Sequence, residues 1–168
     1  VEDGTELLEN MTEQGLNYFT EAESDSGGVN SARGDVGAYN IRNMGVGNTL
    51  VLLNGRRLVN NAGYQTELIG EDYIPTMTVN SQAIPVLNLD RVEVLRDGAS
   101  AIYGADAVAG VINTVLKDDF DGLTMRVRQN WYDSFDAKDN KVSIQWGQTM
   151  SDGSNLSIYF DRYDRERV

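Results

Sequence analysis

Carboxylates are the most plentiful side chains in this sequence that could perform chemistry. Asp118, Asp119 and Asp121 lie close together, and Glu71 is followed by Asp72. A carboxylate pair can act as general acid and base when burial raises the pKa of one group beside an ionised partner. Both runs adjoin glycine in polar stretches, where side chains are usually solvated. An acid–base hydrolase is therefore a distant alternative.

Metal and cofactor chemistry are not predicted either. The carboxylates of 118–121 could offer oxygen ligands to Ca²⁺, but the run lacks the Asp-x-Asp-x-Asp-Gly spacing and the distal Glu of a calcium loop. Gly45-x-Gly47 lacks the lysine of a phosphate-binding loop. The sequence has no Cys and no His, which removes thiolate and imidazole groups as nucleophiles, bases and ligands.

Composition narrows the function further. The 168 residues suffice for one domain or slightly more. Lys and Arg number 14 against 26 Asp and Glu, giving a net charge of −12, which argues against a nucleic-acid partner. No apolar run approaches the ~20 residues of a membrane helix. The first residues do not read as a signal peptide, so we expect that an exported protein has lost its start here.

The elements of the chain are expected to centre on the stretch Leu89–Lys117. Apolar and polar residues alternate over 91–96, which predicts a strand. Asp97-Gly98 is typical of a turn. Small residues over 99–109 indicate a tight helical segment, and the β-branched run 111–116 predicts a second strand.

Upstream of this stretch the sequence predicts short elements and long connections. A helix is expected near 6–11 and strands at 39–42 and 49–53, with Asn54-Gly55 as a hairpin turn that leads into a return strand at 56–59. The residues between them are read as loops at 24–37 and 60–85 and a turn at 45–48. A connection as long as 60–85 is usually functional or disordered.

Beyond Lys117, apolar and polar residues alternate cleanly in three runs. The runs cover 123–131, 142–147 and 156–161 and are separated by turn residues. Such strands are typical of an outer-membrane barrel wall. The edge of a soluble antiparallel sheet has the same period. Because a barrel needs about eight strands at least, the sequence is expected to be an internal piece of a larger protein.

Five short motifs in this sequence are more specific than its pattern of apolar and polar residues. They are Asn40-Ile-Arg-Asn-Met-Gly45, Leu50-Val-Leu-Leu-Asn-Gly-Arg56, Arg91-Val-Glu-Val-Leu-Arg96, Ala99-Ser-x-x-Tyr-Gly104 and Ala107-x-x-Gly-Val-Ile-Asn113. Together they resemble the plug domain of TonB-dependent outer-membrane receptors. Two positions depart from the family pattern, since Asp97-Gly98 stands where many members have Gly-Pro, and Ala109 replaces a glycine.

This resemblance implies a fold and a domain organisation. The fold class is an α+β plug, with a small mixed sheet and short helices, followed by antiparallel transmembrane β-barrel strands. Residues 1–117 would form the plug domain with its N-terminal part missing, and residues 118–168 the first barrel strands. The complete barrel would have about 22 strands and a plugged lumen.

The resemblance also implies a function and partners. The receptor would sit in the outer membrane of a Gram-negative bacterium, bind a scarce nutrient outside, and import it to the periplasm with energy transmitted by TonB. TonB would act through a segment absent from this chain. The nutrient would be small, such as a siderophore, glycan or peptide, the barrel would contact outer-membrane lipid, and no enzyme activity or cofactor is expected. The alternative is a soluble periplasmic or surface binding module without a transport role.

Residue roles follow from the same resemblance. Three loops, 27–38, 44–48 and 60–80, would face the ligand. The residues expected to contact it are Arg33, Asn48, Tyr64 and Tyr73. Arg42 and Arg96 would contact carboxylates of the inner barrel wall, because a guanidinium is always charged and binds carboxylates bidentately. The alternative is that each arginine pairs with the nearest carboxylate, which contributes little when exposed.

Overall fold

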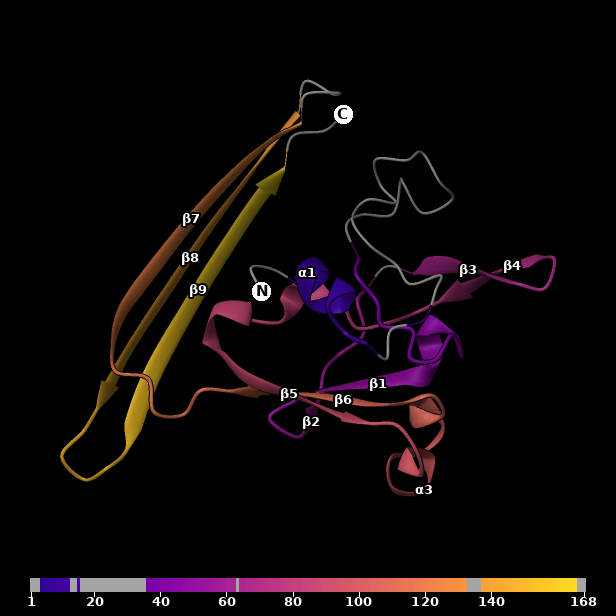
Figure 1. Ribbon diagram of the computed structural model, residues 1–168, viewed down its shortest axis with the longest axis horizontal. Coiled ribbons are helices and arrows are strands. Elements are labelled where there is room, and N and C mark those ends of the chain that lie inside the picture. The colour runs from indigo at the N-terminus through magenta and orange to yellow at the C-terminus, as the bar shows by residue number, and fades with distance from the viewer. Residues whose placement is uncertain (1–3, 13–14, 16–35, 63, 133–136, 166–168) are drawn as a thin grey trace. The chain divides into compact units, whose positions relative to one another are not determined.

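A computed structural model describes residues 4–12, 15, 36–62, 64–132 and 137–165 of the chain (Figure 1). The chain forms two compact units. Unit 1 comprises residues 1–86 and 90–116, and unit 2 comprises 87–89 and 117–168. Within the part that the structure describes, none of the helices has the length and apolar character needed to cross a membrane.

Unit 1 is built on a mixed sheet with the strand order β2-β1-β6-β5. The strands are β1 (Thr49–Leu53), β2 (Arg56–Arg57), β5 (Leu89–Leu95) and β6 (Gly110–Leu116). β1 pairs antiparallel with β2 and parallel with β6. Asn54 and Gly55 have φ values of 48° and 75°, the left-handed pair that a two-residue hairpin turn requires. The predicted strand at 49–53 and the hairpin after it are confirmed.

Both faces of this sheet are covered by apolar side chains. Val51 and Ile112 pack in a cluster on one face, while Leu50, Leu52 and Val111 pack in a second cluster on the other. Consecutive residues of a strand point to opposite faces, so both strands need apolar residues at consecutive positions where both faces are covered. This explains why 50–53 in β1 and 111–112 in β6 are apolar runs that do not alternate.

Short helical turns complete unit 1. They are α1 (Gly4–Glu9), α3 (Ala99–Tyr103), and the 3-10 turns η2 (Val46–Asn48), η3 (Ser81–Ala83) and η5 (Ala105–Ala107). A further 3-10 turn, η4 (Val86–Asn88), begins at the last residue of 1–86 and continues into unit 2. Gly110, with φ of 149°, lies so close to β5 that a Cβ atom there would be 2.6 Å from the carbonyl oxygen of Leu95. The strand–turn–helix–strand order predicted for Leu89–Lys117 is confirmed.

Two predictions for unit 1 are wrong. The expected loop 60–85 contains an antiparallel hairpin, β3 (Gln65–Ile69) with β4 (Asp72–Thr76); Pro75 within β4 hid the strand pattern. The strand expected at 39–42 is reduced to isolated bridges at Ala38 and Ile41. The reason is that Arg42 and Asn43 have φ values of 56° and 58°, which no strand accommodates.

The antiparallel sheet described in unit 2 has the order β7-β8-β9. Its strands are β7 (Gly122–Tyr132), β8 (Ala137–Thr149) and β9 (Asn155–Arg165). The turn between β8 and β9 is the predicted one: Gly153 has φ of 84°, and the Ser154 amide donates to Asp152 Oδ1 at 3.0 Å. The strands extend beyond the alternating runs that predicted them.

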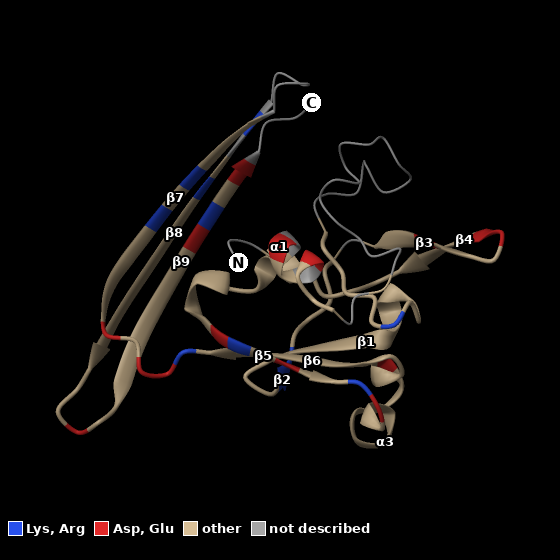
Figure 2. Cartoon of the chain, viewed as in Figure 1, with Lys and Arg blue, Asp and Glu red and all other residues tan. Residues whose placement is uncertain are grey.

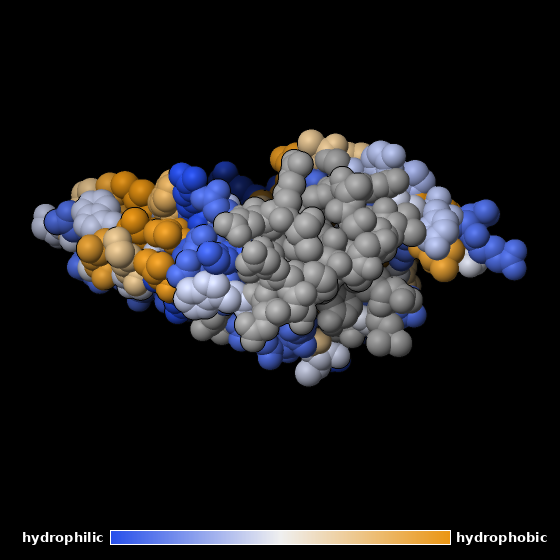
Figure 3. Space-filling view, turned by 90° about the horizontal axis from the view of Figure 1, so that it is seen from above, coloured by the Kyte–Doolittle hydropathy of each residue, from blue (hydrophilic) through white to orange (hydrophobic). Residues whose placement is uncertain are grey.

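The two faces of this sheet differ sharply in character. Apolar side chains opposite one another in the register, such as Met125 and Ile144 or Ile144 and Phe160, share one face. Most of them are exposed, for example Val127 at 67% and Phe160 at 55%, and apolar surface gathers over these strands in Figure 3. The opposite face is polar. The assignment of apolar and polar residues to opposite faces is confirmed.

Candidate functional site

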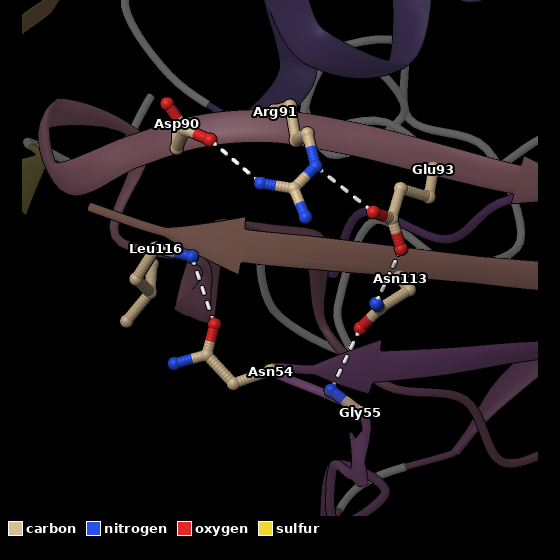
Figure 4. Close-up of polar contacts among 7 residues, drawn as sticks. All are labelled: Asn54, Gly55, Asp90, Arg91, Glu93, Asn113 and Leu116. Carbon is tan, nitrogen blue, oxygen red and sulfur yellow. Dashed lines mark hydrogen bonds and ion pairs between the residues drawn. The ribbon is translucent and has the colours of Figure 1, made fainter. Parts of the chain in front are cut away.

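A chain of polar contacts links the motif residues of β5 and β6 (Figure 4). Arg91 donates through Nη1 to Asp90 Oδ2 at 2.8 Å and through Nε to Glu93 Oε1 at 2.9 Å. Asn113 Nδ2, on β6, donates to Glu93 Oε2 at 2.9 Å. The Asn113 and Arg91 donors, in that order of importance, lower the pKa of the Glu93 carboxyl, because both favour its ionised form.

The same contacts continue to the hairpin after β1. Asn113 Oδ1 accepts from the Gly55 amide at 2.9 Å, and Asn54 Oδ1 accepts from the Leu116 amide at 2.8 Å. Each amide side chain therefore bridges two neighbouring strands. Three motifs that are far apart in the sequence meet here, and nothing in their spacing indicated that they would.

Arg42 has its partners within unit 1. Its Nη1 donates to Asp97 Oδ1 and its Nη2 to the carbonyl oxygen of Ala109, both at 3.0 Å. Asp97 and Ala109 are the two positions at which the sequence departs from the family pattern, and Asp97 supplies a carboxylate where many members have glycine. The predicted contacts of Arg42 and Arg96 with barrel carboxylates stay predictions.

Hydrogen bonds connect residues of the three loops that are expected to face a ligand. The Gly37 amide donates to Asn80 Oδ1 at 3.0 Å, which joins the end of the first loop to the end of the third. The Val46 amide donates to Glu67 Oε1 at 3.3 Å, which joins the second loop to β3. Gly47 lies against β4, since a Cβ atom there would be 2.9 Å from Thr76 Cγ2.

The predicted ligand residues differ in how accessible they are. Tyr64 is 48% and Tyr73 58% exposed. Asn48 is half-buried, and its Nδ2 donates to the carbonyl oxygen of Met44 at 2.7 Å, so this amide stabilises its own turn. Arg33 lies outside the described residues. The ligand roles of all four residues stay predictions.

Sequence reasoning missed the apolar character of the β3–β4 hairpin. Leu68 and Tyr73 stand opposite each other in the register, and Leu68, Ile69, Tyr73 and Ile74 are between 41% and 58% exposed. The tip is acidic, with Glu71 and Asp72 (Figure 2). A two-stranded hairpin is marginally stable alone, so its apolar side chains are available to a partner. Residues 65–69 do not alternate between polar and apolar types, so their pattern did not predict a strand.

A cavity of about 310 Å³ lies in unit 1 between β1 and the segment 77–79. Arg57, paired with Asp106 at 2.6 Å, lines it together with apolar side chains. Thr78 also lines it, is 7% exposed, and has an Oγ1 without a hydrogen-bond partner among the described residues. The polar groups that line the cavity are the threonines Thr49 and Thr78, Asn60 and the Arg57–Asp106 ion pair.

No metal centre forms among the residues that the structure describes, since they contain no group of three acidic side chains able to hold an ion. Of the run 118–121, Asp121 accepts through Oδ2 from the Thr149 amide at 3.0 Å. The three carboxylates of this run thus do not form such a group.

Unit 1 is a mixed-sheet domain with short helices, and the sheet described in unit 2 is antiparallel with one apolar and one polar face. A family model described as TonB-dependent Receptor Plug Domain matches residues 8–111, and the chain belongs to this family. The resemblance noted in the sequence is confirmed.

Two relatives illustrate the likeness. The chain is 34% identical over 91 residues to the ferric enterobactin receptor PirA of Pseudomonas aeruginosa, covering 54% of the chain and 12% of that protein. It is 33% identical over 92 residues to an iron-regulated outer membrane virulence protein of Vibrio cholerae, covering 51% and 12%. The matched region thus spans about an eighth of the length of these relatives.

Proposed function

We propose that the chain is part of a receptor that binds a scarce nutrient outside the cell and imports it to the periplasm with energy transmitted by TonB. The observation that carries the proposal is the plug family match over residues 8–111. Contact with TonB and a place in a Gram-negative outer membrane are part of the same proposal, and family membership supports both. In this proposal residues 1–117 act as the plug and residues 118–168 as the first wall strands.

The strands of unit 2 support the proposed membrane role. An apolar face that is exposed on all three strands suits contact with outer-membrane lipid, whereas the polar face suits a water-filled lumen. In the complete receptor these strands would belong to a closed barrel of about 22 strands.

The proposed ligand surface is formed by the three joined loops and the β3–β4 hairpin. Tyr64 and Tyr73 would contact the nutrient through their rings and hydroxyl groups, as tyrosines commonly do at binding surfaces, with Asn48 and Arg33 as further contacts. The name of one relative makes ferric enterobactin the first cargo to test. Glycans and peptides are the other candidates.

The test is uptake by the full-length receptor in a Gram-negative strain without siderophore receptors of its own. Labelled ferric enterobactin, a glycan mixture and a peptide mixture are each supplied, with and without TonB. Import of one class that requires TonB supports the proposal. Binding without any TonB-dependent import of the three classes contradicts it and favours a binding module.

The same strain tests the ligand surface. Tyr73→Ala should weaken binding of the imported nutrient about tenfold, since one buried aromatic contact contributes on the order of 1–2 kcal/mol. The control is Ile102→Ala on α3, which also removes a large exposed side chain, at 75% against 58% for Tyr73, but lies outside the loops. Equal losses in both variants would remove the hairpin from the ligand surface.

A further inference from the structure

The segment 87–89 belongs to unit 2, although the residues before and after it belong to unit 1. The chain therefore passes between the units at three points: before Leu87, after Leu89 and before Lys117. The second and third of these points bound the stretch 90–116, which carries β5, α3 and β6. We call residues 87–89 together with Lys117 the neck.

One residue of the neck makes both of the contacts that close it. The carbonyl oxygen of Asn88 accepts from the Lys117 amide at 2.9 Å. The side-chain Oδ1 of Asn88 accepts from Gln145 Nε2, on β8, at 2.5 Å. The first bond joins the two ends of the stretch 90–116, and the second fixes that junction to the middle of a long strand.

The Asn88–Gln145 pair is shielded from water. Asn88 is 5% and Gln145 1% exposed. Water competes poorly for a buried amide pair, and loss of one partner leaves the other unsatisfied in a site where desolvation is unfavourable. Gln145 lies on the polar face of its sheet, and its side chain also contacts the main-chain segment 87–89 through Asn88.

We propose that Asn88 and Gln145 are positioning residues that keep the neck closed, so that the stretch 90–116 leaves unit 2 and returns to it at one fixed point. With the neck closed, displacement of residues before Leu87 does not open the junction of β5 and β6 with unit 2. With the pair broken, this junction becomes two independent linkers. The inference concerns the connection within the chain and holds whether or not the receptor imports a nutrient.

The test is hydrogen exchange of the full-length receptor in lipid vesicles, followed at single amides. Gln145→Leu keeps the volume and removes the donor. The Lys117 amide, whose acceptor is Asn88, should then exchange about tenfold faster, as expected for loss of one net hydrogen bond. Amides of the β8–β9 ladder should change by less than about twofold.

Two further variants make the result decisive. Gln148 is exposed on the same strand, and Gln148→Leu should leave the exchange rate of the Lys117 amide unchanged. Asn88→Ala removes the same contact from the other side; its effect should equal that of Gln145→Leu and should not add to it in the double variant. Unchanged exchange at Lys117, an equal effect of Gln148→Leu, or equal loosening of the whole β8–β9 ladder would each overturn the proposal.

Discussion

At the residue scale, the amide side chains of Asn54 and Asn113 form hydrogen bonds between motifs that are separate in the sequence. Asn113 joins Glu93 to the Gly55 amide, and Asn54 joins the hairpin turn to the end of β6. Each asparagine can donate and accept at once, which suits a position between two strands. Because these partners are far apart in the sequence, the motifs could be recognised while their mutual contacts could not be predicted.

The Glu93 carboxyl gives a titration that tests this network. Its pKa is held below the ordinary value of about 4.3 chiefly by Asn113. Because Asn113 is the main cause of this lowering, Asn113→Ala should raise the pKa of Glu93 toward its ordinary value.

The lowered pKa also makes stability depend on pH. The ionised Glu93 stabilises the folded protein at a pH above its pKa in the unfolded chain, and this stabilisation is lost as the pH falls through its pKa in the folded protein.

The measurement is a carboxyl carbon NMR titration of both proteins. Asp152 is the internal control, because its pKa is lowered by Ser154, in a different unit, and should not respond. If the pKa of Glu93 is the same in both proteins, Asn113 does not control that carboxyl and the network is not formed in solution.

At the element scale, the structure shows which patterns predict strands well. β1 and the three strands of unit 2 follow from a continuous apolar run and from strict alternation. The β3–β4 hairpin could not be predicted in this way, because β4 contains Pro75 and because several of the apolar side chains of the hairpin are exposed. No strand forms at 39–42 because Arg42 and Asn43 adopt left-handed backbone, a conformation that is uncommon for residues other than glycine and especially for arginine.

The apolar face of β7–β9 gives a prediction at this scale. Val127→Arg should destabilise the full-length receptor by about 2–4 kcal/mol if this side chain contacts lipid near the bilayer midplane. The control is Arg126→Val, the adjacent residue on the polar face, which should change stability by less than about 1 kcal/mol. Urea-dependent refolding into lipid vesicles measures both. Similar values for the two variants would mean that the faces are assigned the wrong way round.

At the scale of the whole molecule, the two units differ in what stabilises them. Unit 1 has apolar clusters on both faces of a small sheet, together with Tyr39, whose phenol lies in one cluster with no hydrogen-bond partner among the described residues. Unit 2 has a single described sheet with its apolar face exposed. The family and the general fold could be predicted from motifs, whereas the neck could not, since it depends on one amide contact between Asn88 and Gln145.

Unit 1 separated from unit 2 should be soluble but loosely ordered. Residues 5–117 retain the mixed sheet but lose Gln145, so Asn88 keeps only one of its two contacts. We expect a broad thermal transition, below the ~60 °C at which well-packed small domains melt cooperatively. Calorimetry measures it, with the same residues within the full receptor as the control. A sharp transition above that temperature would contradict this expectation.

The parallel pairing of β1 with β6 has a consequence for the order in which the chain acquires its structure. The hydrogen bond from Thr114 to Leu52 spans 62 residues, whereas β1 and β2 need only the adjacent turn. During synthesis β1 can pair with β2 early, but its other edge stays unpaired until β6 has been made. Over that interval Leu50, Val51 and Leu52 lie in an apolar strand with one open edge, which is the kind of segment that aggregates. We therefore expect the tendency of the chain to aggregate to fall once β6 is available to pair with β1.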